Sequence, residues 1–542
     1  MSIASEITRI TGNVSDSYTA ANAKGATMPA TQDSDHLAAT IATIPSGITP
    51  TGTKNITTNG THDVAAYEYA DVQVPTTAPA HYIEYVSNNG AAMPGGTVIN
   101  LNGLTSIPAY CFAYAYYKTL NKVSQQSVDF STIVAVSGMY AFANAFYDAY
   151  WVSGEINLNA LTFIGGMNAF ESAFARSSAS TNYPLITGLK CNLLETINGN
   201  VAFGNAFNKN PGLANGVEFK KLKTTASNSF DDAFRQSGIT SADFRALETI
   251  NGFNRTFQES TSLTTINFGA ATTVAWGQYM CYGCTSLSNV NISNLEQISG
   301  GASFSYAFGG CTALQDIDLN KLYLISCVST SSPYGAASGL FWSCSSLQNI
   351  GMKSLKTISG HATNSARGVC AYMFQKCIAL PTFKFQSLDS ITGGYCMSYM
   401  FAGCTSLLSL WFYALKTTSF GSYTTQFNNM LNGVTGCTVH FPMAIQSTIG
   451  SWSDVTNGFG GTSTTVLFDI VTSLTGADTV TYTRQEKDST STATAWNDGN
   501  DTLFYTSGVS DHTNGVHEPS IGDTIYSDAA CTTAVTTIST IA

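Results

Sequence analysis

The sequence predicts a solenoid of stacked repeats, in which short parallel strands are joined by irregular or helical return segments. N-terminal helices and a small all-β C-terminal domain are expected to flank this solenoid. Two observations lead to this fold class. The chain has 542 residues, whereas a single hydrophobic core stops growing at about 250–300 residues. An apolar pattern also recurs along the chain from about residue 95 to residue 442.

The repeated pattern places the same apolar residue types at fixed offsets. In the best copies a Phe and a closing Ile are 17 residues apart, at 308 and 325, 341 and 358, and 374 and 391. The connection from that Ile to the next copy varies between about 7 and 16 residues. Fixed spacing indicates the stacked part of each coil, and variable spacing indicates loops along one edge. The alternation Leu-x-x-Ile-x-Leu inside each copy predicts a short strand, so successive coils should form a parallel sheet. We count about ten repeats with periods of about 24 to 33 residues.

The flanking segments differ from the repeats. Ile3, Ile7, Ile10 and Val14 recur at helical spacing, which predicts an amphipathic N-terminal helix whose apolar stripe has no partner within its own segment. Asn59-Gly60 between β-type runs predicts a hairpin. The expected division of the chain is an N-terminal helical attachment or oligomerisation segment (1–45), a small β-hairpin module (46–76), the solenoid (77–442), a cap or linker (443–475) and a small β domain (476–542).

Composition excludes several classes of protein. With 23 Lys and Arg against 34 Asp and Glu the net charge is −11, which argues against a nucleic-acid-binding protein. The longest apolar run is far shorter than the roughly 20 residues of a membrane span. The first residues lack the basic and apolar regions of a signal peptide. Thirteen cysteines are an odd number in a large chain, so a disulfide framework is not expected.

The repeat resembles the BspA-like (Treponema type) leucine-rich repeat, which reads F-x-x-C-x-x-L-x-x-I-x-L-x-x-L-x-x-I. Residues 374–380 (Phe-Gln-Lys-Cys-Ile-Ala-Leu) and 401–407 (Phe-Ala-Gly-Cys-Thr-Ser-Leu) are close matches, whereas copies before residue 250 lack the Cys. The resemblance covers about 60% of the chain, residues 77–442 being the solenoid. It implies a right-handed leucine-rich-repeat solenoid used for adhesion and recognition, usually on bacterial surfaces.

The flanks are similar to bacteriophage tail fibre and receptor-binding proteins. Residues 3–45 look like the N-terminal segment of many phage tail proteins, a helix and then a short helix that ends in Ile44-Pro45-Ser46-Gly47. Residues 52–64 are similar to a β module that recurs in tail and fibre proteins, and residues 522–531 look like the end of the same class. This resemblance implies a virion protein that is released by lysis, which fits the lack of a signal peptide.

Residues with possible chemistry favour structural roles. Cys284, Cys311, Cys344, Cys377 and Cys404 occupy one repeat position, which predicts a ladder of small buried thiols. The spacing of Cys281 and Cys284 suits a metal, but no second pair accompanies it. His512 and His517 suggest a cation site in a loop. The alternative interpretation is a solvated polar loop that binds no cation. The carboxylate pairs 231/232 and 316/318 lie within repeats, where polar positions should face solvent, so catalysis is not expected. We predict no enzyme activity, no metal and no cofactor.

The variable loops carry the better functional signal. Tyr offers a flat apolar ring with a polar tip, and Asn, Ser and Thr add adaptable hydrogen bonds, a composition that suits glycans or proteins. Some of these tyrosines are instead expected only to cover the solenoid edge. The predicted ligand-binding residues are Tyr306, Tyr334, His361, Arg367, Tyr372, Tyr395, Tyr399 and Tyr423.

The leading hypothesis is a non-enzymatic phage virion protein, a tail fibre or receptor-binding protein that adheres to its bacterial host through the solenoid loops, the C-terminal domain or both. Expected partners are a host-surface glycan or protein and other tail or baseplate proteins, with a homo-oligomer, favoured as a trimer, and with no nucleic acid and no membrane insertion. The alternatives are a bacterial BspA-like surface adhesin, a glycan depolymerase and a structural virion fibre without a receptor. An export signal would favour the bacterial adhesin, and a cleft with paired carboxylates would favour the depolymerase. Unchanged host adsorption after loop deletion would favour the structural fibre.

Overall fold

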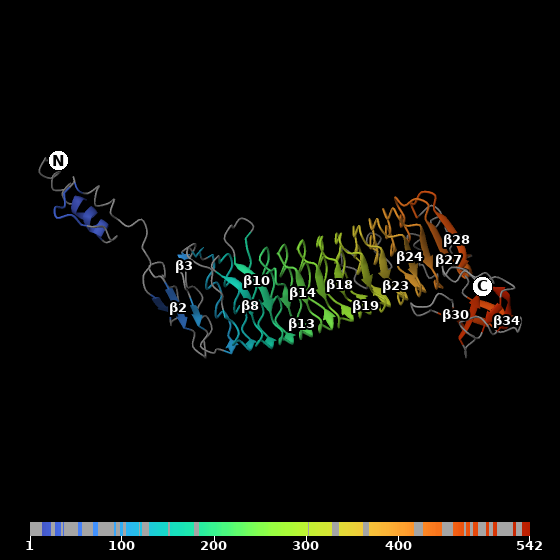
Figure 1. Cartoon of the computed structure of the whole chain (residues 1–542), viewed down its shortest axis with the longest axis horizontal. Coiled ribbons are helices and arrows are strands. Elements are labelled where there is room, and N and C mark those ends of the chain that lie inside the picture. Colours follow the sequence, from blue (N-terminus) through green and yellow to red (C-terminus); the bar gives the residue numbers. More distant parts are fainter. Residues whose placement is uncertain are drawn as a thin grey trace.

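The computed structural model is an elongated stack of coils, with a helix beyond the N-terminal end and a small barrel beyond the C-terminal end (Figure 1). The structure describes residues 13–22, 28–33, 36, 53–56, 69–73, 92–93, 98–100, 105–118, 120–121, 129–149, 152–177, 184–301, 303–327, 335–360, 368–416, 426–446, 459–470, 473–476, 481–485, 495–497, 502–506, 524–526 and 534–541.

Each coil of the solenoid has three sides, and two of them are short strands that pair in parallel with the same strand of the next coil. These strands are short because each coil turns a corner after two to six residues. The strands on the first side are β8 (Ser153–Asn157), β10 (Leu185–Lys190), β12 (Val217–Glu218), β14 (Ser241–Asp243), β16 (Thr265–Asn267), β18 (Asn289–Asn291), β20 (Asp316–Asp318), β22 (Asn349–Gly351), β24 (Thr382–Phe385), β26 (Ser409–Phe412), β27 (Thr438–Pro442) and β28 (Thr465–Ile470).

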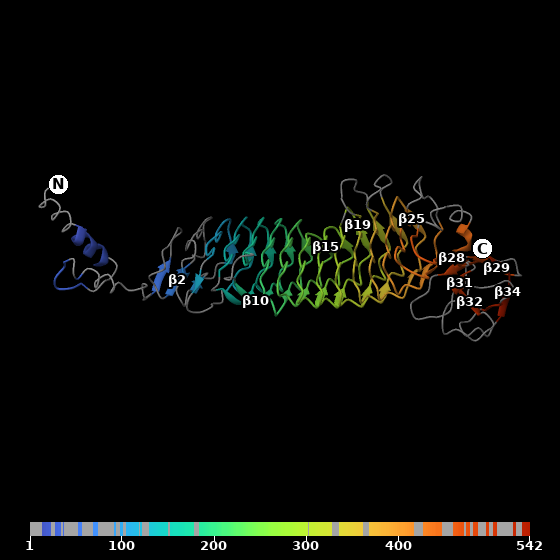
Figure 2. The same ribbon diagram turned by 90° about the horizontal axis from the view of Figure 1, so that it is seen from above.

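The second side forms two parallel sheets of five and six strands, so the described part of the solenoid has about eleven complete turns (Figure 2). The predicted solenoid with a parallel sheet is therefore confirmed. The strands on this side are β5 (Ser106–Ile107), β7 (Ala135–Val136), β9 (Phe163–Ile164), β11 (Thr196–Ile197), β13 (Thr224–Thr225), β15 (Thr249–Ile250), β17 (Thr273–Val274), β19 (Gln297–Ser299), β21 (Leu324–Ser326), β23 (Thr357–Ser359) and β25 (Ser390–Thr392).

The third side, which we call the turn face, consists of consecutive tight turns and has no helix among the described residues. Its amides alternate between two kinds of acceptor. The amide of Phe112 donates to the carbonyl of Ala141 in the next coil (2.8 Å), and the amide of Ala113 donates to the carbonyl of Tyr110 in its own turn (3.3 Å). This alternation gives these irregular segments hydrogen-bond partners and holds neighbouring coils in register.

The core is filled by side chains that stack from coil to coil. One ladder of buried rings runs through Phe112, Phe142, Phe170, Phe203, Phe230 and Phe253, with centroids 4.9–5.3 Å apart. Another joins Phe308, Phe341, Phe374 and Phe401 at 5.4–5.7 Å. Stacked aromatic pairs stabilise by about 0.5–1.5 kcal/mol beyond the burial of their area. The second ladder consists of the repeated Phe of the sequence, and the first lies four residues before that position, so both positions fix one coil on the next.

The cysteine of the repeat makes a second coil-to-coil contact. Its Sγ donates to the backbone carbonyl of the residue at the Phe position one coil earlier, as from Cys344 to Phe308 (3.1 Å) and from Cys377 to Phe341 (3.2 Å). Ser260 occupies the same position and its Oγ donates to Phe234 in the same way (2.7 Å). The five cysteines are buried and unpaired, which confirms the predicted thiol ladder.

The β-hairpin predicted for residues 46–76 stays a prediction, because its turn is not described, and the two strands that are described there do not form it. Strands β1 (Thr53–Ile56) and β2 (Tyr69–Gln73) are present but pair in parallel, and a hairpin requires antiparallel strands. Strand β2 also pairs in parallel with β4 (Val98–Asn100), so one sheet crosses the boundary expected at residue 76. A local turn signal cannot reveal a partner strand that comes later in the chain. Asn59 and Gly60 lie outside the described residues.

Parallel stacking also continues past the expected C-terminal boundary of the solenoid. Strand β28 pairs in parallel with β27, so the stacked sheet extends to Ile470, inside the segment expected to be a cap or linker. The 3-10 helix η1 (Met443–Ile445) also lies at this end of the solenoid. At its start, two short strands, β3 (Ala92–Met93) and β6 (Leu120–Asn121), pair in parallel.

The predicted all-β C-terminal domain is confirmed as a closed antiparallel barrel in which each strand pairs with the next and the last pairs with the first. Closure leaves this small sheet without open edges. Its strands are β29 (Ser473–Gly476), β30 (Thr481–Gln485), β31 (Ala495–Asn497), β32 (Thr502–Thr506), β33 (Thr524–Tyr526) and β34 (Ala534–Ile541).

The expected N-terminal helix is present at residues 13–22. Tyr18 and Ala21 are its buried apolar residues, and the Tyr18 hydroxyl donates to the carbonyl of Asp33 (2.8 Å). Val14 of the predicted stripe is half-buried, and Ile3, Ile7 and Ile10 lie outside the described residues. In the part of the chain that the structure describes, no helix has the length and apolarity needed to cross a membrane.

We expect Cys344 and Cys404 to resist alkylation in the folded protein. Burial raises the pKa of both thiols from 9.0 to about 12, so the reactive thiolate is scarce. Iodoacetamide at about pH 8 should modify them only after unfolding in guanidinium, as read by peptide mass spectrometry. Because the thiols ionise near their ordinary pKa only in the unfolded chain, stability should fall as the pH rises above about 9. Modification of either thiol in the native protein would contradict the buried ladder.

Candidate functional site

One residue of every coil stands at the centre of the turn face with a positive φ, and these residues align from coil to coil through the backbone hydrogen bonds of that face. Their φ values lie between +51° and +62°, a region that is uncommon for residues other than Gly and Asn. We call this row the central column. Its members are Tyr114, Asn144, Ser172, Asn205, Asp232, Arg255, Tyr279, Tyr306, Gly339, Tyr372, Tyr399 and Asn429.

Tyrosines gather in the C-terminal half of the central column. The rings of Tyr279 and Tyr306 stack at 5.3 Å, and those of Tyr372 and Tyr399 stack at 5.3 Å. Asn429, at the next position, donates from Nδ2 to the Tyr399 hydroxyl (3.0 Å). The aromatic surface therefore extends over several adjacent coils.

Gly339 separates the two tyrosine pairs. A Cβ atom at this position would lie 2.4 Å from Cε1 of Tyr306, so the Tyr306 ring occupies the space that a side chain would need. The φ of Gly339 is +62°, which costs other residues about 1–2 kcal/mol. Because Gly339 has no side chain, the ring of Tyr306 can lie over the neighbouring coil.

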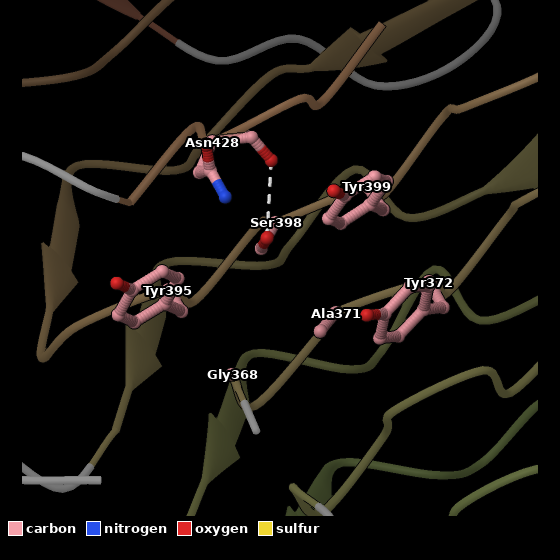
Figure 3. Close-up of a pocket in the computed structure, with 7 residues that line it drawn as sticks. All are labelled: Gly368, Ala371, Tyr372, Tyr395, Ser398, Tyr399 and Asn428. Carbon is pink, nitrogen blue, oxygen red and sulfur yellow. Dashed lines mark hydrogen bonds between the residues drawn. The ribbon is translucent and has the colours of Figure 1, made fainter. Parts of the chain in front are cut away.

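A pocket of about 130 Å³ opens beside Tyr372 and Tyr399 (Figure 3). Tyr395 stands on the opposite side, and Ser398 and Ala371 lie between the tyrosines. A side chain at the lining residue Gly368 would meet the backbone of Tyr395, because a Cβ there would lie 1.5 Å from that carbonyl oxygen. The described residues that line the pocket are Gly368, Ala371, Tyr372, Tyr395, Ser398, Tyr399 and Asn428, and none of these carries a charge.

The pocket offers both hydrogen-bond donors and acceptors. Ser398 uses its proton on the carbonyl of Asn428 (3.0 Å), so the lone pairs of its Oγ face outward as acceptors. Oδ1 of Asn428 accepts from Asn429 (3.1 Å), whereas Nδ2 of Asn428 has no partner among the described residues. The hydroxyls of Tyr372 and Tyr399 point toward Ala371 and Ser398 (Figure 3). Burial, and secondarily Tyr399, raises the pKa of Tyr372, which keeps that hydroxyl a donor at neutral pH.

A second aromatic group adjoins the central column on the turn face. Trp342 stacks with Tyr282 at 6.1 Å and meets Tyr306 edge-on at 6.4 Å. The indole Nε1 of Trp342 donates to Gln375 (2.9 Å), and the ammonium of Lys376 lies 5.6 Å from the centre of its ring. The positive charge of Lys376 is thus held over Trp342.

The structure brings three of the predicted binding residues, Tyr372, Tyr395 and Tyr399, into this pocket and places Tyr306 in the central column nearby. The other predicted residues, Tyr334, His361, Arg367 and Tyr423, lie outside the described residues. Their ligand-binding role stays a prediction.

Sequence reasoning did not select Ser398, Ala371, Asn428 or Gly368. Two of these follow from the repeat register, because the column tyrosines at 306, 372 and 399 are two residues before the Phe position and follow a small residue, as in Ala371 and Ser398. Asn428 and Gly368 have no such signal, since the repeat is irregular there.

The other titratable groups considered from the sequence make contacts within the solenoid. The Asp232 carboxylate accepts from Nε and Nη2 of Arg255 on the next coil (3.0 and 2.7 Å). The side chain of Asp231 accepts from the amide of Asn254 (3.1 Å), and burial raises its pKa. Within the described ranges no three His, Cys, Asp or Glu residues form a cluster that could hold a metal. His512 and His517 lie outside these ranges.

The carboxylate pair Asp316 and Asp318 lies at the surface, whereas the thiol pair Cys281 and Cys284 lies in the core. Asp316 and Asp318 are exposed on β20, where Asp316 accepts from Nδ2 of Asn349 (2.6 Å) and Asp318 accepts from the amide of Asn320 (2.9 Å). Cys281 and Cys284 are buried in the core. The expected solvent exposure is therefore confirmed for Asp316 and Asp318, whereas it is wrong for Asp232, which is buried and accepts from Arg255.

Comparison with known proteins agrees with this architecture. Residues 227–332 and 338–439 match the family described as BspA type leucine rich repeat region, in six copies. The matched residues include the tyrosine pairs and the pocket. No curated protein matches the chain significantly.

Two solved structures have low similarity to this chain. A leucine-rich repeat protein from Bacteroides ovatus is 14% identical with a TM-score of 0.35, over 77% of this chain and 92% of that chain. A structure described as a TLR13–ssRNA13 complex is 12% identical with a TM-score of 0.21, over 64% of this chain and 50% of that chain.

We expect the Gly339→Ala substitution to destabilise the solenoid by about 1–2 kcal/mol because of its positive φ, with a further cost from displacing the Tyr306 ring. Combining it with Tyr306→Asn should relieve the second cost only. Unfolding midpoints of both single variants and the double variant give the coupling between the two residues. Strictly additive effects would contradict the contact between Tyr306 and residue 339.

Proposed function

We propose that this protein is a non-enzymatic adhesin that recognises a bacterial cell surface through the turn face of its solenoid. The observation that supports this most directly is the pocket formed by Tyr372, Tyr395 and Tyr399. Tyrosine side chains supply large contact area at low entropic cost, and clustered aromatics are enriched where proteins bind one another or smaller ligands.

Binding without catalysis fits the lining of the pocket. A general acid or base must exchange a proton near neutral pH, a role filled by His, carboxylates, Lys, Tyr or Cys in most enzymes. Among the described lining residues only tyrosines are of these types, and burial raises the pKa of Tyr372 further above its ordinary value, away from neutral pH. The hydroxyls and the amide present there suit positioning of a ligand.

A stacked solenoid is a suitable support for such a site. The pocket residues come from adjacent coils whose Phe374 and Phe401 rings stack in the core at 5.4 Å, so the lining residues are held by packed structure. Weak single sites gain avidity when several copies act together. An oligomer formed through the N-terminal segment, favoured as a trimer, would provide those copies.

The proposed setting is a phage virion, with the protein as a tail fibre or receptor-binding protein attached to other tail or baseplate proteins. The flanks of the sequence that resemble phage tail proteins support this setting. The alternative is a bacterial surface adhesin, and the match to BspA-type repeats is the observation that favours it.

We expect Tyr395→Asn and Tyr372→Asn to weaken binding of the labelled protein to its host cells by about tenfold or more, because buried aromatic anchors dominate binding energy. Asn tolerates the positive φ of both positions, so the backbone should be kept. Flow cytometry over a dilution series measures the binding. Tyr114→Asn is the matched control, since it changes the same residue type in the same column far from the pocket. Equal binding by all four proteins would contradict recognition through the pocket.

We expect antibodies against the solenoid to label phage tails and not the envelope of uninfected cells. The reason is that the flanking segments resemble those that attach tail proteins to the particle. Electron microscopy of gold-labelled virions and of cells without phage shows whether the antibody binds the tail or the cell envelope. Labelling of the cell envelope alone would replace the virion setting with that of a bacterial adhesin.

A further inference from the structure

We infer that the pocket between Tyr395 and the Tyr372–Tyr399 pair binds a single uncharged sugar ring, the end or a branch of a surface glycan. This inference rests on the proposed function and names the ligand class of the same site. Three properties of the pocket lead to it: its lack of charge, its mixture of hydrogen-bonding groups and its size.

The first property argues against a charged ligand. None of the lining residues that the structure describes is ionic, and the nearby Lys376 has its ammonium over the Trp342 ring. A carboxylate, phosphate or ammonium that entered the pocket would lose hydration without gaining a counter-charge, which is costly. An uncharged ligand avoids this cost.

The second property points to a polyhydroxylated ligand. Nδ2 of Asn428 is a donor without a partner among the described residues, and Oγ of Ser398 has free lone pairs because its proton is used on the Asn428 carbonyl. The Tyr399 hydroxyl accepts from Asn429, so its own proton remains available to donate. Sugar hydroxyls both donate and accept, and they complement this set. A purely apolar ligand would leave these groups unpaired at a cost.

Apolar surface lies next to those polar groups. Ala371 and Gly368 line the pocket between the tyrosines, where no larger side chain occupies the space. A pyranose ring combines hydroxyls at its edge with faces of C–H groups. The methyl group of Ala371 and the aromatic carbons of the tyrosines can receive such a face while the hydroxyls reach Asn428 and Ser398.

The third property sets the size of the ligand. A volume of about 130 Å³ equals roughly four water molecules at about 30 Å³ each. A pyranose ring with its hydroxyls is larger than this, so the pocket receives one face or edge of a single ring, and the rest of a glycan remains outside. The ligand should then be a terminal or branching sugar, since the middle of an unbranched chain would need an open groove on both sides.

Saturation-transfer NMR on the full-length protein tests this inference. The probes are the neutral methyl glycosides of glucose, galactose, mannose and N-acetylglucosamine, with glucuronic acid and N-acetylneuraminic acid as charged counterparts. We expect at least one neutral glycoside to bind, and binding to weaken about tenfold or more in Tyr395→Asn and in Asn428→Ala, through loss of a wall and of a hydrogen bond.

Tyr114→Asn should bind the same glycoside as the parent protein does. Binding of no neutral glycoside, tighter binding of the charged sugars, or unchanged binding by Tyr395→Asn would each overturn the inference. Binding of a host-surface peptide at the pocket, competed by no glycoside, would do the same.

The two proposals fail in different ways. If Tyr395→Asn abolishes cell binding although no neutral glycoside binds, the ligand class is wrong and surface recognition stands. If a neutral glycoside binds and Tyr395→Asn removes it while cell binding stays unchanged, the ligand class is correct and the pocket does not mediate adhesion.

Discussion

Coil-to-coil register is the constraint on which the rest of this structure depends. Backbone amides on all three sides of a coil donate to neighbouring coils, and each apolar side chain meets the side chain at the same position one repeat later, as Phe341 meets Phe374. A slip of one residue along a strand would point the buried residues to solvent. The thiol bonds, such as the one from Cys344 to Phe308, fix the same register.

Register explains how a surface site arises on such a regular scaffold. A residue type that recurs at one outward position becomes a column, and two members of the column can stack because their coils are adjacent, as Tyr372 and Tyr399 do. The central column holds Asn144 and Asn205 in early coils and tyrosines in later ones, at the same backbone geometry. Surface chemistry can therefore vary along the solenoid without any change in its core.

The repeat pattern was sufficient to predict the solenoid, its parallel strands and the buried cysteine position, because these depend on periodic contacts between like residues. The parallel pairing of β2 could not be predicted for the opposite reason: its partner, β4, is indicated by no nearby sequence signal. The choice of Tyr372, Tyr395 and Tyr399 came from loop composition alone. Their convergence with Asn428 and Gly368 did not follow from it, because these residues come from three coils and one of the connections varies in length.

By itself the sequence determined what repeats: the fold class, the strand positions, the apolar ladders and the uncharged character of the surface. Only the tertiary structure decided which non-repeating residues meet. Gly368 can line the pocket because the backbone of Tyr395 passes where a Cβ would be, and Asn428 reaches it from the following coil. Such contacts depend on the distance between coils in space, and periodicity along the chain carries no record of them.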